Sequence, residues 1–308
     1  MRNLHIGELR AFHAVVDAGS VTAAASRLDV TQPTVSRLIA SLERRVGFAL
    51  FERAGRRLVL AAEGEAFHRE TERFLSNAES LEEAARNLRG RSTLHTRIVS
   101  MPALAYGLLP QAMARVRDST DRLAIIVDVR RRAEISRWIA GRQFDLGLAS
   151  LPVDYPGIVA RRLAVTHAYA VVPRGHRLAR HTTISADALA SEPLIGLTAE
   201  AVIQERLVRL FRRIGRSPEF SVKTSSLLAV CHFVAAGIGC GVVDPFTAHA
   251  ARDLAIEVRH LQPGLTLHYG ILWEKGRALP PRLERLATLL GEAASDVCEA
   301  VSRRASKR

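Results

Sequence analysis

Apolar residues recur three or four positions apart through the first 50 residues, which is the spacing of amphipathic helices. A first helix is predicted by the positions of Ile6, Leu9, Phe12 and Val16. Gly19 ends this helix, because glycine tolerates the left-handed backbone at which helices stop. Ser20 is suited to cap a short second helix over residues 22–28, whose alanines let another helix approach closely.

A third helix is predicted to follow Thr31, with Pro33 in its first turn, where a missing N–H is harmless. Its core-facing stripe consists of Val35, Leu38, Ile39, Leu42 and Val46. Its other face carries side chains that can contact bases and phosphates: Gln32, Thr34, Ser36, Arg37, Ser41 and Arg44. Two helices joined by a tight turn are typical of a helix-turn-helix. Periodicity alone also permits a helical bundle with a solvated face.

Residues 50–60 form two short segments with apolar edges around Ala54-Gly55, which predicts a hairpin wing. Arginines at the tip of such a wing can lie along phosphates or enter a minor groove, where the negative potential favours them. The predicted DNA-contacting residues are therefore Thr31, Gln32, Pro33, Thr34, Ser36, Arg37, Arg53 and Arg56.

A long helix is predicted from Glu63 to Arg89. Large apolar residues recur in it at intervals of seven, at Phe67, Phe74, Leu81 and Leu88. This heptad seam favours pairing with a second copy of the helix, and we predict dimerisation through these four residues. The alternative is that the stripe covers the helix's own domain.

From about Leu94 onward, candidate strands alternate with candidate helices, which predicts parallel sheets covered by helices. The expected strands are 97–101, 123–129, 146–149, 169–172, 220–224 and 240–244, and the expected helices are 108–117, 133–140, 200–214, 227–236 and 282–298. Such sheets bind ligands at the carboxyl ends of their strands. The candidate ligand-binding residues at these ends are Met101, Pro102, Ala103, Arg131, Arg132, Ser150, Thr198 and Ser225.

Two of these candidates indicate the chemistry of the ligand. Arg131 and Arg132 follow a strand directly, and an arginine fork binds a carboxylate with two hydrogen bonds. The alternative is that they are solvated arginines of a basic surface. Thr198 and Ser226 are also good residues to cap the helices that follow them.

The charge of the chain changes this picture only locally. The 308 residues carry 44 Lys and Arg against 31 Asp and Glu, a net charge of +13. Residues 1–91 hold 14 arginines, no lysine and 12 acidic residues, so only +2 of this charge lies in the predicted DNA reader. The segment from Arg37 to Arg57, however, contains six arginines and only two glutamates, which suits a surface that contacts phosphates.

The spacing of the cysteines and the lengths of the apolar segments indicate where in the cell the protein is expected. Cys231, Cys240 and Cys298 include no C-x-x-C pair, so we expect reduced, mostly buried thiols. The N-terminus shows no signal peptide, and charged residues, glycine or proline interrupt each apolar run. We therefore expect a soluble, cytoplasmic protein without a membrane partner.

The segment from Ala11 to Gly64 resembles the winged helix-turn-helix of the LysR-type transcriptional regulators. The matching residues are Ala11-Phe12, Gly19-Ser20, Ala24-Ala25, Gln32-Pro33, Val35-Ser36, Leu42-Glu43, Gly47, Leu50-Phe51, Arg53 and Glu63-Gly64. Ala61 departs from the family, which commonly has threonine there. The resemblance extends through FDLGLAS, VVPRGHRLA, PLIGL and AVCHFVAAGIGCGVVDPFTA. The last segment and TQPTVSR are most similar to the regulators of lysine biosynthesis and opine catabolism, which implies an amino-acid-like effector.

The resemblance implies an α/β chain in three parts. These are a winged helix-turn-helix over residues 1–61, a linker helix over 62–91, and a two-lobed effector domain over 92–308 that is similar to periplasmic binding proteins. We expect lobe I to hold about 92–165 and 267–308, and lobe II about 166–266.

The expected function is that of a ligand-responsive, DNA-binding transcriptional regulator that senses a small carboxylate or amino-acid-like metabolite. The expected partners are double-stranded DNA, this effector, RNA polymerase and further copies of the chain, in a homodimer or homotetramer. No catalytic residue, metal or cofactor is expected. The alternative is an enzyme that uses the interlobe cleft. The sequence contains no Walker loop, H-E-x-x-H or G-x-S-x-G motif to support it. A solute-binding transport component would require the missing signal peptide.

Overall fold

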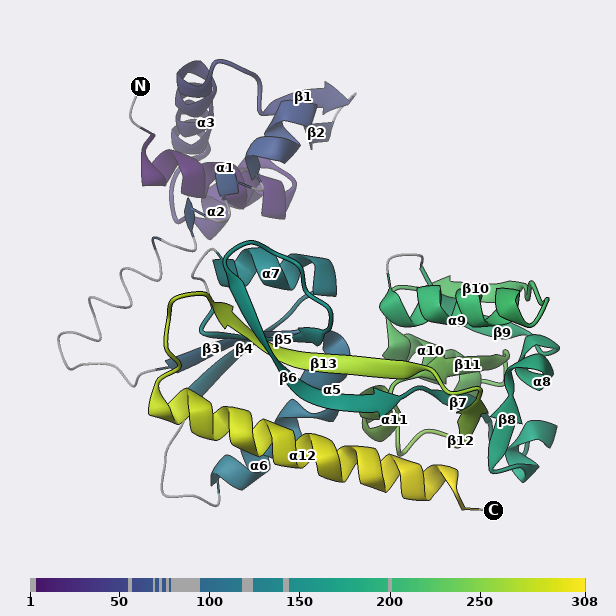
Figure 1. The fold of residues 1–308 in the computed structure, drawn as a ribbon. Helices are drawn as coiled ribbons and strands as arrows, with labels where there is room; N and C mark the ends of the chain where they lie inside the picture. The colour runs from purple at the N-terminus through teal and green to yellow at the C-terminus, as the bar shows by residue number, and fades with distance from the viewer. Residues whose placement is uncertain are drawn as a thin grey trace. The chain divides into compact units, whose positions relative to one another are not determined.

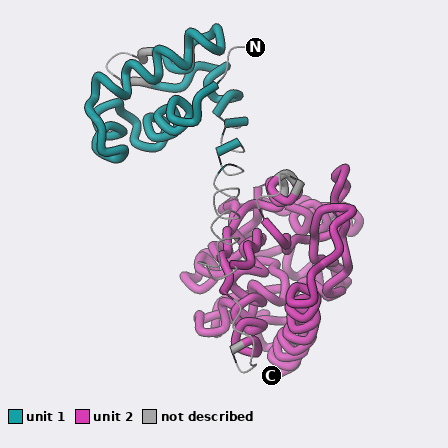
Figure 2. The backbone as a smooth tube through the Cα atoms, turned by 90° about the vertical axis from the view of Figure 1, so that its left-hand side faces the viewer, with its two compact units in different colours: residues 1–93 teal, residues 94–308 magenta. Residues whose placement is uncertain are grey.

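The chain divides into two compact units, residues 1–93 and residues 94–308 (Figure 2). The computed structural model describes residues 4–54, 57–68, 70–71, 74–75, 78, 95–117, 124–140, 144–198 and 201–307. Among these residues, no helix is both long and apolar enough to cross a membrane.

The first unit contains the three helices predicted before the wing and the two strands of the wing, while most of the long helix predicted over residues 63–89 lies outside the described residues. Its elements are α1 (Ile6–Ala18), α2 (Val21–Arg27), α3 (Gln32–Val46), β1 (Phe51–Ala54) and β2 (Arg57–Leu60), with residues 62–68 helical after them. Gly19 follows α1 with a φ of 68°, and the Ser20 hydroxyl accepts a hydrogen bond from the Ala23 N–H at 3.1 Å. Both predicted helix boundaries are thereby confirmed. The strands β1 and β2 pair antiparallel.

The core of this unit is apolar and small-residue-rich. Phe12, Leu42 and Leu50 are fully buried together, while α2 contributes only Ala24 and Ala25 to the buried core. Gly64 lies so close to the chain before β1 that a Cβ there would stand 2.1 Å from the carbonyl oxygen of Leu50. The glycine is therefore required for the helix after the wing to pack against the domain.

A pair of histidines joins α1 to that helix. The rings of His13 and His68 stack with their centroids 4.2 Å apart, and His13 Nε2 lies 2.8 Å from the hydroxyl oxygen of the buried Thr71. The Thr71 hydroxyl lies within donating distance of the Phe67 and His68 carbonyls, so its oxygen accepts a hydrogen bond from the Nε2–H of His13. Burial, together with the neighbouring His68, lowers the pKa of His13 to about 4.

The second unit contains two mixed β-sheets (Figure 1). The five-stranded sheet has the order β4-β3-β5-β13-β6, with β3 (His95–Ser100), β4 (Ala124–Val129), β5 (Leu146–Ser150), β6 (Ile158–His167) and β13 (Thr266–Glu274). The six-stranded sheet has the order β10-β9-β11-β7-β12-β8, with β7 (Tyr169–Pro173), β8 (Thr183–Ser185), β9 (Leu194–Leu197), β10 (Phe220–Thr224), β11 (Cys240–Val243) and β12 (Ile256–Gln262).

Helices connect and cover these strands. They are α5 (Pro102–Gly107), α6 (Leu109–Arg117), α7 (Arg132–Ala140), the 3-10 helix η1 (Arg177–Arg180), α8 (Ala186–Ala190), α9 (Val202–Arg213), α10 (Leu227–Ala235), α11 (Pro245–Ala250) and α12 (Pro281–Ala305). The sequence pattern predicted six of the strands and five of the longer helices, but not β6, β8, β9, β12 or β13, nor α5, α8 and α11.

The expectation of parallel sheets holds for only part of each sheet. The strand β3 runs parallel to β4 and β5, and β9 runs parallel to β10 and β11, as predicted. However, β13 is antiparallel to β5 and β6, and β7 is antiparallel to β11 and β12. A parallel pair needs a crossover, usually a helix, whereas β7 and β13 each follow a strand of the other sheet after one to three residues.

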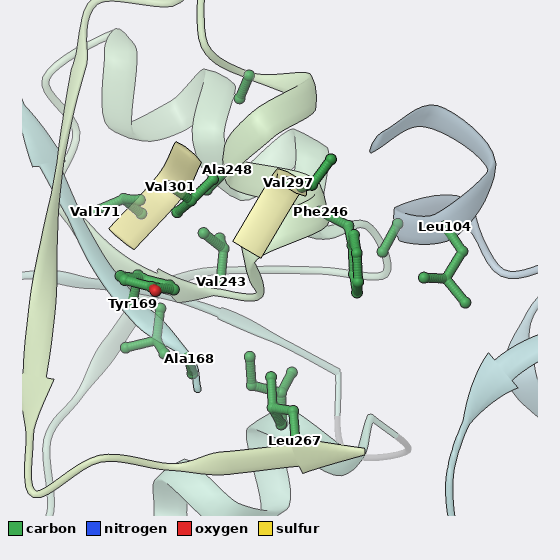
Figure 3. Packing of buried hydrophobic residues seen from close by; sticks show 14 of the residues in the cluster. Leu104, Ala168, Tyr169, Val171, Val243, Phe246, Ala248, Leu267, Val297 and Val301 are labelled. Atoms are coloured by element: carbon green, nitrogen blue, oxygen red, sulfur yellow. The ribbon is translucent and has the colours of Figure 1, made fainter. Parts of the chain in front are cut away.

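One core joins the two sheets. The helix α12 packs against β6 and α6 on one side and against β12 and α11 on the other (Figure 1). Figure 3 shows Val297 and Val301 of this helix beside Ala248 of α11 and Val171 of β7. The segment assigned to lobe I therefore ends in a helix that contacts both lobes.

The two lobes also touch through α5 and α11. A Cβ at Gly107 would stand 2.0 Å from the carbonyl oxygen of Phe246, so the two backbones are in direct contact. No side chain fits at Gly107 unless the lobes separate.

We predict that Gly107→Ala lowers the free energy of unfolding of the second unit by about 1–3 kcal/mol, the usual cost of overpacking. Gly291→Ala is the matched control, because Gly291 lies in α12 and a Cβ added there would meet no atom within 4 Å. The control should stabilise by up to about 1 kcal/mol through helix propensity. Urea unfolding of both variants measures the difference, and equal effects would contradict the interlobe contact.

We predict that the first unit loses stability as the pH falls from 6.5 toward 4. The pKa of His13 is lowered to about 4 in the folded chain, so protons bind preferentially to the unfolded chain in this range. The contribution of neutral His13 to the free energy of unfolding is fully present above pH 6.5. It declines below that pH, with a slope approaching about 1.4 kcal/mol per pH unit for one histidine. Urea unfolding of His13→Gln should show a shallower slope, and the exposed His5→Gln should keep the wild-type slope. Identical slopes in all three proteins would refute the assignment.

Candidate nucleic-acid interface and ligand pocket

The polar face at the start of α3 is open to solvent. Thr31 is the N-cap residue, although its hydroxyl lies 2.9 Å from the Thr34 hydroxyl and accepts no backbone N–H. The side chains of Gln32, Pro33, Ser36 and Arg37 are exposed, and that of Thr34 is half-buried. Donors and acceptors thus gather at the positive end of a helix, as contact with bases and phosphates requires.

One residue of the predicted outer face lies elsewhere. Ser41 donates its hydroxyl proton to Glu8 of α1 at 2.7 Å and is half-buried between the helices. Its position on the polar face was wrong, because periodicity does not show a polar partner 33 residues away.

The wing can be followed only in part. The backbone of Arg53 lies in β1, and its side chain lies outside the described part of the chain. Arg56 lies outside the described residues altogether. Its role on DNA therefore stays a prediction.

The four seam residues differ in their surroundings. Phe67 packs within its own unit, with ring centroids 5.9 Å from Phe12 and 5.7 Å from Phe48. Phe74 is 51% exposed. Leu81 and Leu88 lie outside the described residues. The heptad stripe thus begins as domain core, which was the alternative interpretation, and is open to solvent one heptad later.

The second unit contains a pocket of about 170 Å³. All eight predicted ligand-binding residues line it: Met101, Pro102, Ala103, Arg131, Arg132, Ser150, Thr198 and Ser225. They come from both sheets, at the ends of β3, β4, β5, β9 and β10 or at the start of the following helices. The connection rule for open sheets therefore brought together residues that lie up to 124 positions apart in the sequence.

The pocket also has walls that the sequence pattern did not predict. Tyr106 of α5 is 51% exposed at the pocket, and His268 and Tyr269 of β13 line it together with Thr247 of α11. The alternation of apolar Leu267, Tyr269 and Ile271 with Thr266, His268 and Gly270 in the sequence was the pattern that could have revealed β13.

The two arginines of the pocket have different attachments. Arg132 is half-buried and donates to the backbone carbonyls of Ser150, at 3.1 Å, and of Pro152. Burial lowers its pKa from the ordinary arginine value. Arg131 is 71% exposed and donates to Glu134 within the first turn of α7, at 3.0 Å. Arg132 therefore fixes the loop after β5, while Arg131 is exposed and makes its hydrogen bonds only to Glu134 among the described residues.

The hydroxyl residues of the opposite wall also separate. Ser226 caps α10 by accepting from the Ala229 N–H at 3.4 Å, as predicted. The N-cap of α9 is Ala201, and the backbone N–H of Thr198 donates to the Thr224 carbonyl at 2.9 Å. The alternative that Thr198 caps α9 therefore does not hold, and its exposed side chain lines the pocket.

Buried ionisable groups near the pocket have structural partners. Asp244 is fully buried and accepts from the N–H and the hydroxyl of Thr247, each at 2.9 Å, while burial raises its pKa. Burial also raises the pKa of Cys231 and Cys240 to about 12, so both thiols stay protonated. All three cysteines are free, and Cys298 is partly exposed. No group of three potential metal ligands was found among the described residues.

The two units of the chain match models of one known protein family. Residues 6–65 match the family model described as bacterial regulatory helix-turn-helix protein, lysR family, and residues 89–295 match the LysR substrate binding domain. The chain belongs to the LysR family. This regulator therefore combines a DNA-binding helix-turn-helix with a domain that responds to a ligand.

Similar proteins place this LysR-family member more closely. Regulatory protein NocR of Agrobacterium fabrum (strain C58) is 30% identical over 280 residues, which cover 90% of this chain and 92% of NocR. Transcriptional activator protein LysR of Escherichia coli (strain K12) is 30% identical over 83% of both chains. The octopine catabolism/uptake operon regulatory protein OccR of Rhizobium meliloti is 28% identical over 81% of this chain and 83% of OccR. The predicted family and its subgroup are confirmed.

The fold of the LysR family is also confirmed. The crystal structure of CbnR, a LysR family transcriptional regulator, superposes with a TM-score of 0.75 at 22% identity, covering 94% of this chain and 99% of CbnR. CbnR in complex with its target DNA superposes with a TM-score of 0.72 at 23% identity, covering 94% of this chain and 100% of that chain.

Proposed function

We propose that this LysR-family regulator senses a small carboxylate or amino-acid-like metabolite in the pocket between its two sheets. The observation that carries the proposal is the convergence of Arg131, Ser150, Thr198 and Ser225 on one pocket from separate strands. A guanidinium binds a carboxylate with paired hydrogen bonds, and hydroxyl groups supply neutral donors. Most of the remaining wall is aliphatic or aromatic, which suits the body of such a metabolite.

The relatives support this ligand class. OccR is named for the catabolism and uptake of octopine. The resemblance to this subgroup implies an amino-acid-like effector, and we propose an amino acid or amino-acid conjugate for this chain.

We also propose that the pocket binds its ligand without converting it. The two buried thiols of the second unit are held protonated by burial, which supports an inert role for Cys231 and Cys240. The family consists of transcriptional regulators, which agrees with a binding role.

On DNA, we propose that the predicted residues of α3 read bases and that Arg53 and Arg56 contact phosphates. The exposure of Gln32, Ser36 and Arg37 supports this division. We propose domain limits of 1–61, 62–91 and 92–308, self-association through the linker helix to a dimer or tetramer, and contact with RNA polymerase at the promoter. The exposed Phe74 supports a seam that begins beyond Phe67.

We predict that Gln32→Ala and Arg37→Ala each weaken the binding free energy for the operator by about 1–3 kcal/mol, the worth of one contacted base pair. Binding to random duplex should change little for Gln32→Ala. Titrations of both duplexes by fluorescence anisotropy at one fixed salt concentration make the comparison. An equal loss on operator and random DNA in both variants would show that α3 does not read bases.

We predict that Arg131→Ala weakens effector binding about 10- to 150-fold, the equivalent of a charged hydrogen bond worth about 1.5–3 kcal/mol. Isothermal calorimetry against a panel of carboxylates, amino acids and amino-acid conjugates measures this effect. Arg174→Ala is the matched control, because Arg174 is 69% exposed and lies outside the pocket. Unchanged affinity in Arg131→Ala would remove this arginine from the site, and an effector that lacks a carboxylate would overturn the ligand class.

A further inference from the structure

The C-terminal half of α3 is attached to α1 by a buried carboxylate. Glu8 lies in the first turn of α1 and is only 4% exposed. Its Oε1 accepts a hydrogen bond from the Ser41 hydroxyl at 2.7 Å and another from Arg45 Nε at 3.0 Å. Ser41 and Arg45 are four residues apart, so they lie on one side of α3. A single oxygen of Glu8 therefore holds two successive turns of the helix.

The ion pair between Glu8 and Arg45 specifies the orientation of the helices more than it adds stability. Burial opposes the charge of Glu8, yet the hydrogen bonds from Ser41 and Arg45 outweigh burial and keep its pKa below the ordinary value. The backbone N–H of His5 also lowers the pKa of this carboxylate. A buried ion pair adds little net stability, since desolvation offsets the attraction between the charges. Its directional bonds nevertheless specify one orientation of the two helices.

The other contacts of α3 are less directional or lie at its end. Val35, Leu38 and Ile39 meet small apolar residues of α1 and α2, and such burial has no preferred angle. At the C-terminal end, Glu43 Oε1 accepts from the N–H groups of Leu50 and Phe51 at 2.8 and 3.4 Å, which ties the helix to the start of β1. The hydrogen bonds to Glu8 are directional contacts between α3 and α1, and they restrict rotation of α3 about its axis beyond what burial of its apolar stripe does.

We propose that Glu8 is a positioning residue for DNA recognition, which sets the rotation of α3 so that the exposed residues at its other end meet the base edges. This inference rests on the proposal that α3 reads bases. A rotation of about 20° moves a side-chain tip by about 2 Å, because a helix with its side chains has a radius of about 5–6 Å. Hydrogen bonds to bases do not tolerate such a displacement. Sequence discrimination is therefore expected to depend on Glu8, whereas contact with phosphates is not.

The experiment separates orientation from stability by replacing the whole cluster with apolar side chains. The triple variant Glu8→Leu, Ser41→Ala, Arg45→Met leaves the net charge unchanged, because it removes one acid and one base. Replacing a buried ion pair in this way is commonly neutral or stabilising. Asp17→Asn is the matched control, since it also removes a carboxylate of α1, one in an exposed pair with Arg27 at 3.2 Å.

The readout is the ratio of affinities for two duplexes, measured with the full-length chain. One duplex is selected from a random library by the wild-type chain, and the other is a scrambled sequence of the same composition. The triple variant should keep the wild-type unfolding midpoint and its affinity for scrambled DNA, while the ratio falls about tenfold or more. Asp17→Asn should keep the wild-type ratio.

Retention of the wild-type ratio by a folded triple variant overturns the inference. If the triple variant does not fold, Ser41→Ala and Arg45→Lys each remove one directional bond and keep the charge of the cluster. Each should lower the ratio at least about threefold, and an unchanged ratio in both also overturns the inference. A wild-type chain that selects no duplex overturns the base-reading role of α3 and this inference with it, so the two failures are distinguishable.

Discussion

The pocket of the second unit is built around the contact between α5 and α11. The backbone of Gly107 rests against the carbonyl of Phe246, and α12 packs across both lobes behind this contact. The carboxyl ends of β3, β5 and β9 consequently line the same space, although they belong to two sheets. Each lobe supplies only part of the pocket wall, so the polar residues of the pocket converge only while the lobes are held together.

The first unit relies on a different balance of forces. Its helices are joined by small and apolar residues, whose burial supplies stability without a preferred angle. Polar contacts add direction: Glu8 bonds to α3, Glu43 bonds to the start of the wing, and His13 joins α1 to the helix that follows the wing. These contacts place exposed donors on a rigid helix, which is the condition for reading a sequence of bases.

Local sequence patterns predicted what local physics determines. Helix caps at Ser20 and Ser226 follow from neighbouring residues. The junctions between predicted elements likewise led to eight of the residues that line the pocket, although β9, which precedes Thr198, was not among the predicted strands. The patterns failed where the cause lies far away in the sequence. Ser41 was placed outward because its partner Glu8 lies 33 residues earlier, and the antiparallel pairing of β13 could not be predicted because its partner strands are distant in the sequence. The alternative that Thr198 caps a helix failed because α9 begins at Val202, two residues later than expected.

The central claim is that a carboxylate metabolite binds between the two sheets and is held from both of them. Hydrogen–deuterium exchange of the full-length chain, with and without the carboxylate that calorimetry identifies, tests this claim most directly. The account predicts slower exchange at the starts of α5 and α10 and at the ends of β5 and β9, that is, on both sides of the pocket. Protection confined to one sheet, or located away from these four segments, would contradict it.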